Sequence, residues 1–111
     1  MRKKSWHGGA IAGVTGIYKG AVFKLAPNEV VVIGRDPAES NIVISEESTF
    51  VSRKHCSVKF DSSLGCYIIC DYSQNGVKMD EKYKLVKGVE TAAERGSIIE
   101  IGNADNTFKL I

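Results

Sequence analysis

Long apolar runs, proline and cysteine are all scarce in this chain of 111 residues. No stretch approaches the ~18 consecutive apolar residues that a membrane-spanning helix needs, so we expect no membrane partner. The basic start Met1-Arg2-Lys3-Lys4 is followed by polar residues and glycine at the positions where a signal peptide has its apolar core. The sequence therefore predicts no secretory signal peptide.

Cysteine occurs only three times, and the three positions lack the paired spacing of zinc ligands. We therefore expect buried thiols in a reduced, cytoplasmic protein, with no metal and no cofactor. The formal net charge is only +2. This excess of positive charge is too small to indicate a nucleic-acid partner.

The residue types that are abundant favour β-structure. Valine and isoleucine together number 22, whereas leucine and alanine together number 12. Because β-branched side chains fit a pleated sheet and lose rotamer freedom in a helix, this ratio predicts an all-β fold. Turn residues separate nine short apolar runs, as in a β-sandwich or barrel, and only residues 90–95 could form a helical turn. The runs are residues 11–15, 21–25, 30–33, 41–44, 56–60, 66–70, 76–79, 97–101 and 107–111.

The domain organisation follows from length and from the composition of the first residues. A chain of 12.1 kDa is long enough for one domain with its own core. Residues 1–10 are basic and contain glycine. We predict a flexible lead-in over residues 1–10 and a single domain over residues 11–111.

One hairpin is detailed enough for its register to be predicted. Phe60 and Cys66 flank a loop of five residues, and pairing them places Cys56 opposite Cys70. The even positions of both strands are then apolar, so all three thiols face the core. Packing thiols are the main interpretation. A Cys56–Cys70 disulfide formed by oxidation and a catalytic thiol are the alternatives.

Three polar loops, residues 34–37, 48–55 and 71–76, lie between the apolar runs. Loops held by a rigid scaffold commonly carry binding residues. If these loops meet at one end of the fold, they form a cationic, donor-rich site suited to a phosphate monoester. The side chains concerned are the cations Arg35, Arg53 and Lys54, the hydroxyls of Ser48, Thr49, Ser52 and Ser73, and the amides of Gln74 and Asn75.

The same loops carry three motifs in order: Gly34-Arg35, Ser52-Arg53-Lys54-His55 and Asn75-Gly76. This set resembles the signature of the forkhead-associated (FHA) domain family, and the similarity extends over residues 11–111. Residues 96–102 are also similar to a late strand of that family, with serine where aspartate is usual. The resemblance implies an FHA-like β-sandwich of about eleven short, mostly antiparallel strands. Such domains bind phosphothreonine peptides through loops at one end and are not enzymes.

The resemblance assigns phosphate-binding roles to three residues. It implies that Arg35 contacts the phosphate, that the Ser52 hydroxyl donates to a phosphate oxygen and that Arg53 adds a contact. A different interpretation of Arg35 is a surface ion pair with Asp36 or Glu39, and Arg53 could be an ordinary solvated charge.

The resemblance also assigns residues to the peptide and to the support of the site. Asn75 would hydrogen-bond the peptide main chain, and the amide of Gln74 beside it could add a contact. Gly34 and Gly76 would allow the backbone to turn tightly. His55 would brace the loops from below instead of reacting.

Two positions depart from the family pattern. Gln74 stands where threonine or serine is frequent, and Val77 stands where threonine is frequent. Both changes remove a hydroxyl near the expected site. They motivate an alternative in which the chain is an FHA-like scaffold that binds unphosphorylated protein, or itself, with a degenerate phosphate site.

A hydrolase is a further alternative, because Ser52, His55 and Asp71 are residue types of a catalytic triad. Ser52 and His55 are only three positions apart, however, and no G-x-S-x-G elbow is present. We therefore expect no enzyme. We expect a cytoplasmic, monomeric adaptor for signalling or assembly, whose partner is a phosphothreonine-containing protein.

Overall fold

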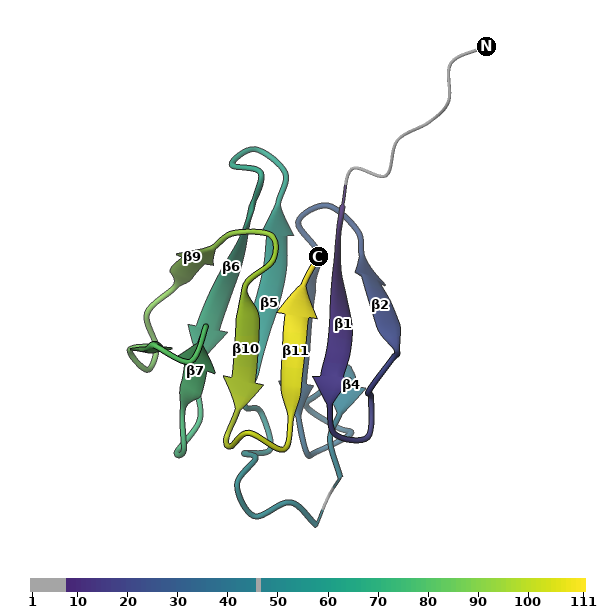
Figure 1. The fold of residues 1–111 in the computed structure, drawn as a ribbon, viewed down its shortest axis with the longest axis vertical. Coiled ribbons are helices and arrows are strands. Elements are labelled where there is room, and N and C mark those ends of the chain that lie inside the picture. The colour runs from purple at the N-terminus through teal and green to yellow at the C-terminus, as the bar shows by residue number, and fades with distance from the viewer. Residues whose placement is uncertain (1–7, 46) are drawn as a thin grey trace.

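The computed structural model describes residues 8–45 and 47–111. These residues form eleven β-strands arranged as two facing sheets (Figure 1). Within the same residues, no helix is long and apolar enough to span a membrane. The strands are β1 (Gly9–Thr15), β2 (Val22–Leu25), β3 (Val30–Gly34), β4 (Ile42–Val43), β5 (Cys56–Asp61), β6 (Cys66–Asp71), β7 (Val77–Met79), β8 (Tyr83–Lys84), β9 (Thr91–Ala93), β10 (Ile98–Ile101) and β11 (Thr107–Leu110).

The strand order defines the two layers of the sandwich. One sheet has six strands in the order β2-β1-β11-β10-β7-β8, and the other has five in the order β4-β3-β5-β6-β9. Among these strands the pairings are antiparallel, apart from the parallel β3–β4 pair. The mostly antiparallel sandwich of eleven strands that the resemblance implied is therefore confirmed.

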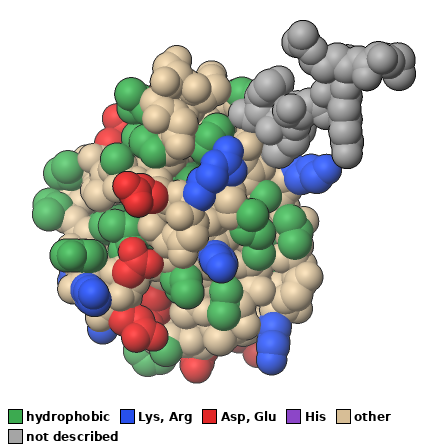
Figure 2. Space-filling model, turned by 45° about the horizontal axis from the view of Figure 1, so that its top comes forward, with side chains coloured by type: hydrophobic (Ala, Val, Ile, Leu, Met, Phe, Trp, Pro, Cys, Tyr) green, Lys and Arg blue, Asp and Glu red, His purple; other side chains and the backbone are tan. Residues whose placement is uncertain are grey.

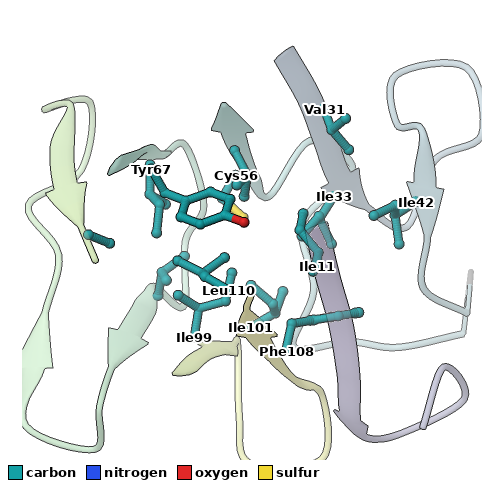
Figure 3. Packing of buried hydrophobic residues seen from close by; sticks show 14 of the residues in the cluster. Ile11, Val31, Ile33, Ile42, Cys56, Tyr67, Ile99, Ile101, Phe108 and Leu110 are labelled. Atoms are coloured by element: carbon teal, nitrogen blue, oxygen red, sulfur yellow. The ribbon is translucent and has the colours of Figure 1, made fainter. Parts of the chain in front are cut away.

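Alternating side chains of the strands fill the space between the sheets. In β5, Cys56, Val58 and Phe60 are buried, whereas the residues between them are partly exposed. Since successive side chains of a strand point to opposite faces, this alternation marks one face as the core. Figure 3 shows side chains of both sheets meeting in this layer. Its largest fully buried members include Tyr67, Phe108, Ile11, Leu25, Ile33, Ile69, Ile99, Ile101 and Leu110.

The predicted register of the β5–β6 hairpin is wrong by one residue. Phe60 pairs with Tyr67, and Asp61 pairs with Cys66. The turn decides the difference, because the Asp61 carboxylate accepts hydrogen bonds from the backbone N–H groups of Ser63 and Leu64 at 3.0 Å. The loop between the paired residues Asp61 and Cys66 therefore has four residues, 62–65, instead of the five predicted. A shift of one residue turns every side chain of a strand to the opposite face.

The shift moves two of the three thiols off the core face. Cys56 remains in the core, but Cys66 is partly exposed and Cys70 is buried on the outer face of the sheet. Tyr67 and Ile69 take the core positions of β6 instead. All three cysteines are unpaired. Because Cys56 lies opposite Asp71 and not Cys70, the disulfide alternative has no support.

Two short strands were not predicted. β8 is polar and lies at the edge of the six-stranded sheet, and β9 pairs with β6 at residues 67–69. Residues 90–95, the only stretch that the sequence left open as a helical turn, instead contain β9. Of the predicted lead-in, residues 1–7 lie outside the described part of the chain, whereas Gly9 and Ala10 already belong to β1.

The surface carries charges of both signs. On the face drawn in Figure 2, hydrophobic, basic and acidic side chains are interspersed instead of gathered into a patch of one kind. With a formal net charge of only +2, no strong field of one sign is expected across the molecule, so a ligand preference depends on local groups.

Candidate functional site

The three predicted loops lie together at one end of the sandwich, the lower end in Figure 1. The strand register explains this. Ile33 near the end of β3 pairs with Cys56 at the start of β5, and Cys56 pairs with Asp71 at the end of β6. Antiparallel neighbours alternate in direction, so the loop after β3, the loop before β5 and the loop after β6 share one edge.

Backbone hydrogen bonds hold the loop after β3 against the loop before β5. The Arg35 N–H donates to the Ser52 carbonyl at 3.1 Å, and the Asp36 N–H donates to the Arg53 carbonyl at 3.3 Å. The Ser40 hydroxyl donates to the same Arg53 carbonyl at 2.7 Å. The structure thus brings together the three residues that were predicted to bind phosphate.

Gly34 permits this close approach. A Cβ atom at position 34 would lie only 2.0 Å from the Arg53 carbonyl oxygen and 2.4 Å from the Ser40 Oγ atom. Since real Cβ atoms do not come so close to a backbone oxygen, any side chain at position 34 would push the two loops apart.

The guanidinium-bearing residues border a shallow hollow of about 300 Å³. Arg35, Asp36, Pro37 and Arg53 line it, with Arg35 partly buried and Arg53 exposed. Arginine presents several N–H donors in a planar fork that matches the oxygens of a carboxylate or a phosphate. The hollow can therefore hold an anion.

The loop after β6 joins the site through two contacts. The Gln74 N–H donates to the Ser52 Oγ atom at 3.2 Å, and the Asn75 side-chain amide donates to the Phe50 carbonyl at 3.2 Å. Because Ser52 Oγ accepts this bond, its own hydrogen can be given to a ligand oxygen. The side chains of Gln74 and Asn75 are both exposed.

Ser73 does not contribute its hydroxyl to a ligand, contrary to the prediction. Its side chain is 3% exposed. The hydroxyl donates to the Asp71 carboxylate at 2.6 Å and accepts from the Gly76 N–H at 2.7 Å. These bonds shape the turn, and Gly76 completes it with a φ of +90°.

His55 lies beneath the loops and is fully buried. Its Nδ1 atom accepts from the Ser52 N–H at 3.0 Å, so Nε2 carries the hydrogen and donates it to the Gly76 carbonyl at 2.8 Å. Burial lowers the pKa of His55, while the bond to Gly76 and the nearby Asp71 carboxylate partly oppose that shift. The imidazole is therefore neutral and links the two loops.

The ring contacts of His55 also bear on the hydrolase alternative. A general base must reach the hydroxyl that it activates. Both ring nitrogens of His55 are instead engaged with backbone groups, those of Ser52 and Gly76. Within residues 8–45 and 47–111, no three His, Cys, Asp or Glu side chains are grouped so that they could hold a metal ion.

Sequence reasoning missed several residues of the site. Ser40 and Phe50 support it through contacts between loops distant in sequence, for which the sequence carries no local signal. Phe50 is 51% exposed. Val77, the second departure from the family pattern, is fully buried in the core.

A family comparison bears on this geometry. The family model of the FHA domain matches residues 31–102, which is well over half of the chain. The match spans the strands and all three loops of the candidate site. Among curated protein sequences, none matches the chain.

Solved structures of the same fold resemble the chain along nearly its whole length. The FHA domain of the CT664 protein from Chlamydia trachomatis has 22% identity and a TM-score of 0.80, covering 94% of this chain and 96% of its own. An FHA domain of a hypothetical protein of Arabidopsis thaliana has 19% identity and a TM-score of 0.79, with coverages of 99% and 91%. The N-terminal FHA domain of S. cerevisiae Rad53p, solved with a phosphothreonine peptide, has 19% identity, a TM-score of 0.71 and coverages of 93% and 90%.

Proposed function

The chain belongs to the FHA domain family, and from this membership we propose that it binds phosphothreonine in a partner protein. FHA domains are interaction modules and not enzymes. The domain would act as an adaptor in signalling or assembly, as a monomer in the cytoplasm.

The single observation that carries the proposal is the junction of the first two loops. Arg35, Ser52 and Arg53 come from segments 17 residues apart and are held together by backbone hydrogen bonds. Arg35 and Arg53 line one hollow at this end of the scaffold, and Ser52 belongs to the same hydrogen-bonded junction. Each charge-assisted hydrogen bond contributes about 1.5–3 kcal/mol, so two or three are enough for modest binding of a phosphate dianion.

The peptide main chain would lie along the neighbouring loop. The Asn75 amide nitrogen is anchored on the Phe50 carbonyl at 3.2 Å, which orients the side chain. Its amide oxygen can then accept from a peptide N–H. The exposed amide of Gln74 adds a donor in place of the hydroxyl that is frequent at this position in the family.

Calorimetry with matched peptides tests the proposal. A phosphothreonine peptide chosen from a library with randomised flanks is compared with its unphosphorylated twin. We expect binding of the phosphorylated form only. Arg35→Ala and Ser52→Ala should each weaken binding of the phosphorylated peptide at least tenfold, since each removes a charge-assisted contact. Lys109→Ala is the control: it removes an exposed cation from the face of the six-stranded sheet and should leave the affinity unchanged.

The same titration tests the scaffold alternative. The exposed Gln74 and the buried Val77, which stand where hydroxyl side chains are frequent in the family, motivate that alternative. Equal affinity for the two peptides, or binding that is indifferent to Arg35→Ala, would refute the phosphothreonine proposal and favour a scaffold that recognises unphosphorylated protein.

A further inference from the structure

A groove leads away from the candidate site across the outer face of the six-stranded sheet. Its first part is a hollow of about 230 Å³ whose lining includes Asn75, Lys78, Lys84 and Glu100. Asn75 also belongs to the candidate site, so the hollow begins where the proposed peptide site ends. Lys84 lies over the β6–β7 turn, because a Cβ atom at Gly76 would be 2.8 Å from its Cε atom.

The second part of the groove is a hollow of about 290 Å³ on the same face. Its lining includes Val14, Ile98 and Thr107 as well as Lys78 and Glu100. Both hollows share Lys78 and Glu100 as lining residues, so they are neighbours on this face, and we call them together the sheet groove.

The charges of the sheet groove change along its length. Lys78 lies directly opposite Lys84 in the β7–β8 pair and opposite Glu100 in the β10–β7 pair. Two like charges directly opposite each other on neighbouring strands repel and destabilise the sheet. An anionic group placed between the two lysines would remove that repulsion, and this is the end nearest Asn75.

The far end of the sheet groove combines apolar side chains with polar ones, the latter being Thr15, Thr107 and Glu81. Ile98 and Val14 are each 37% exposed on the outer face. Gly102, at the near end, lies four positions along the chain from Ile98, which is about 13 Å at the rise of an extended chain. A ligand segment of about four extended residues therefore reaches from one end of the groove to the other.

We propose that the sheet groove holds a further segment of the phosphorylated partner. An anionic side chain of that segment lies against Lys78 and Lys84, and an aliphatic side chain about four residues further on covers Ile98 and Val14. The inference rests on the proposed phosphothreonine function, since continuity with Asn75 is what identifies the occupant as the same partner chain.

Peptides of two lengths test the proposal. The short probe is the phosphothreonine peptide described above, and the long probes extend it on either side. Extensions place aspartate and leucine four residues apart, phosphoserine in place of the aspartate, or alanine throughout. We expect an aspartate–leucine extension on one side to raise the affinity about tenfold over the alanine extension, combining an exposed ion pair with apolar burial. A larger gain with phosphoserine would identify a second phosphate as the preferred anion.

Matched variants on the two sheets test whether the gain in affinity depends on the sheet groove. Lys84→Glu and Ile98→Ser should each remove most of the gain while leaving the short probe unaffected. Lys59→Glu and Val30→Ser are the controls, because they place the same changes on the outer face of the other sheet, where Lys59 and Val30 pair. Both control variants should retain the gain in affinity of the aspartate–leucine extension. Thermal melting confirms that each variant is folded.

The proposal for the sheet groove would be overturned if the aspartate–leucine and phosphoserine extensions bound no more tightly than the alanine extension. It would also be overturned if Lys84→Glu retained the gain in affinity. That failure differs from failure of the phosphothreonine function itself, which would appear as equal binding of the short probe and its unphosphorylated twin.

Discussion

At the scale of single residues, one buried imidazole ties the loop of Ser52 to the turn that carries Asn75. His55 can do so only while it is neutral, because Nδ1 must accept the Ser52 N–H. Protonation at Nδ1 would break that bond and place a charge in the core. The state of the site and the stability of the fold are therefore linked through one side chain.

This link predicts a pH dependence of stability. Burial lowers the pKa of His55 below its ordinary value of 6.5. Below pH 6.5 the unfolded chain binds a proton that the folded chain still excludes, so the free energy of unfolding falls as the pH falls. Urea unfolding between pH 5 and 7.5 should show this slope, and His55→Gln should flatten it. A wild-type slope retained in His55→Gln would contradict the assignment.

Gly34 is the second residue on which the site depends. In Gly34→Ala the new methyl group collides with the Arg53 carbonyl, so we expect a loss of about 1–3 kcal/mol in stability and a loss of phosphopeptide binding. Gly20→Ala is the comparison for backbone strain without a collision, because nothing lies within 4 Å of its Cβ position but its φ of +87° is unfavourable for alanine. It should lose stability and keep phosphopeptide binding. Chemical unfolding and calorimetry measure the two effects. Normal peptide binding by Gly34→Ala would show that the loops can separate without harm.

At the scale of elements, the β5–β6 hairpin shows what periodicity can and cannot predict. Alternation correctly identified both strands and the core face of β5. It failed for β6, because Ile68 and Ile69 make either face of that strand plausible from sequence alone. Asp61 and its capped turn decided the register.

The observed register predicts the order in which the thiols react. Thiolate is the reactive form, and burial raises the pKa of the Cys56 thiol. Cys66 is partly exposed, so iodoacetamide should label it first in the folded protein, with Cys56 protected until unfolding. Mass spectrometry of labelled peptides over time measures the order. Labelling of Cys56 as fast as Cys66 would argue against this register.

At the scale of the whole molecule, Tyr67 of the five-stranded sheet contacts the first and last segments of the six-stranded sheet. The ring is fully buried beside Phe60, with the ring centroids 5.1 Å apart. Its hydroxyl accepts from the Ala10 N–H at 2.8 Å and lies within hydrogen-bond distance of the Ala10 and Ile111 carbonyls. A strand of one sheet thus holds the first and last segments of the other.

This contact predicts a global effect that is separate from the site. Tyr67→Phe should lower the free energy of unfolding by about 1–3 kcal/mol, because it removes the buried hydroxyl that accepts from the Ala10 N–H. The Ala10 and Ile111 carbonyls keep the Ile111 N–H and the Arg95 guanidinium as donors. Phosphopeptide affinity should not change, since the hydroxyl lies far along β6 from the binding loops. Tyr83→Phe, at a position that is 60% exposed, is the control. Urea unfolding measures stability, and equal values for both variants would disprove the role of the hydroxyl.

The sequence by itself determined the class of the fold and the position of its loops. β-Branched runs, turn residues and the motifs at Gly34-Arg35, Ser52–His55 and Asn75-Gly76 are local signals, readable from neighbouring positions. They predicted which loops would carry the site, and the antiparallel strands bring those loops to one end.

Only the tertiary structure decided which polar groups face a ligand and which are used internally. It turned Ser73 and Val77 inward, joined Phe50 to Asn75, and placed Lys78 against Lys84 beside the site. Each of these outcomes depends on turn geometry or on contacts between segments far apart in the chain. Side chains of the same type then differ in role, because burial and hydrogen-bond partners come from those distant segments.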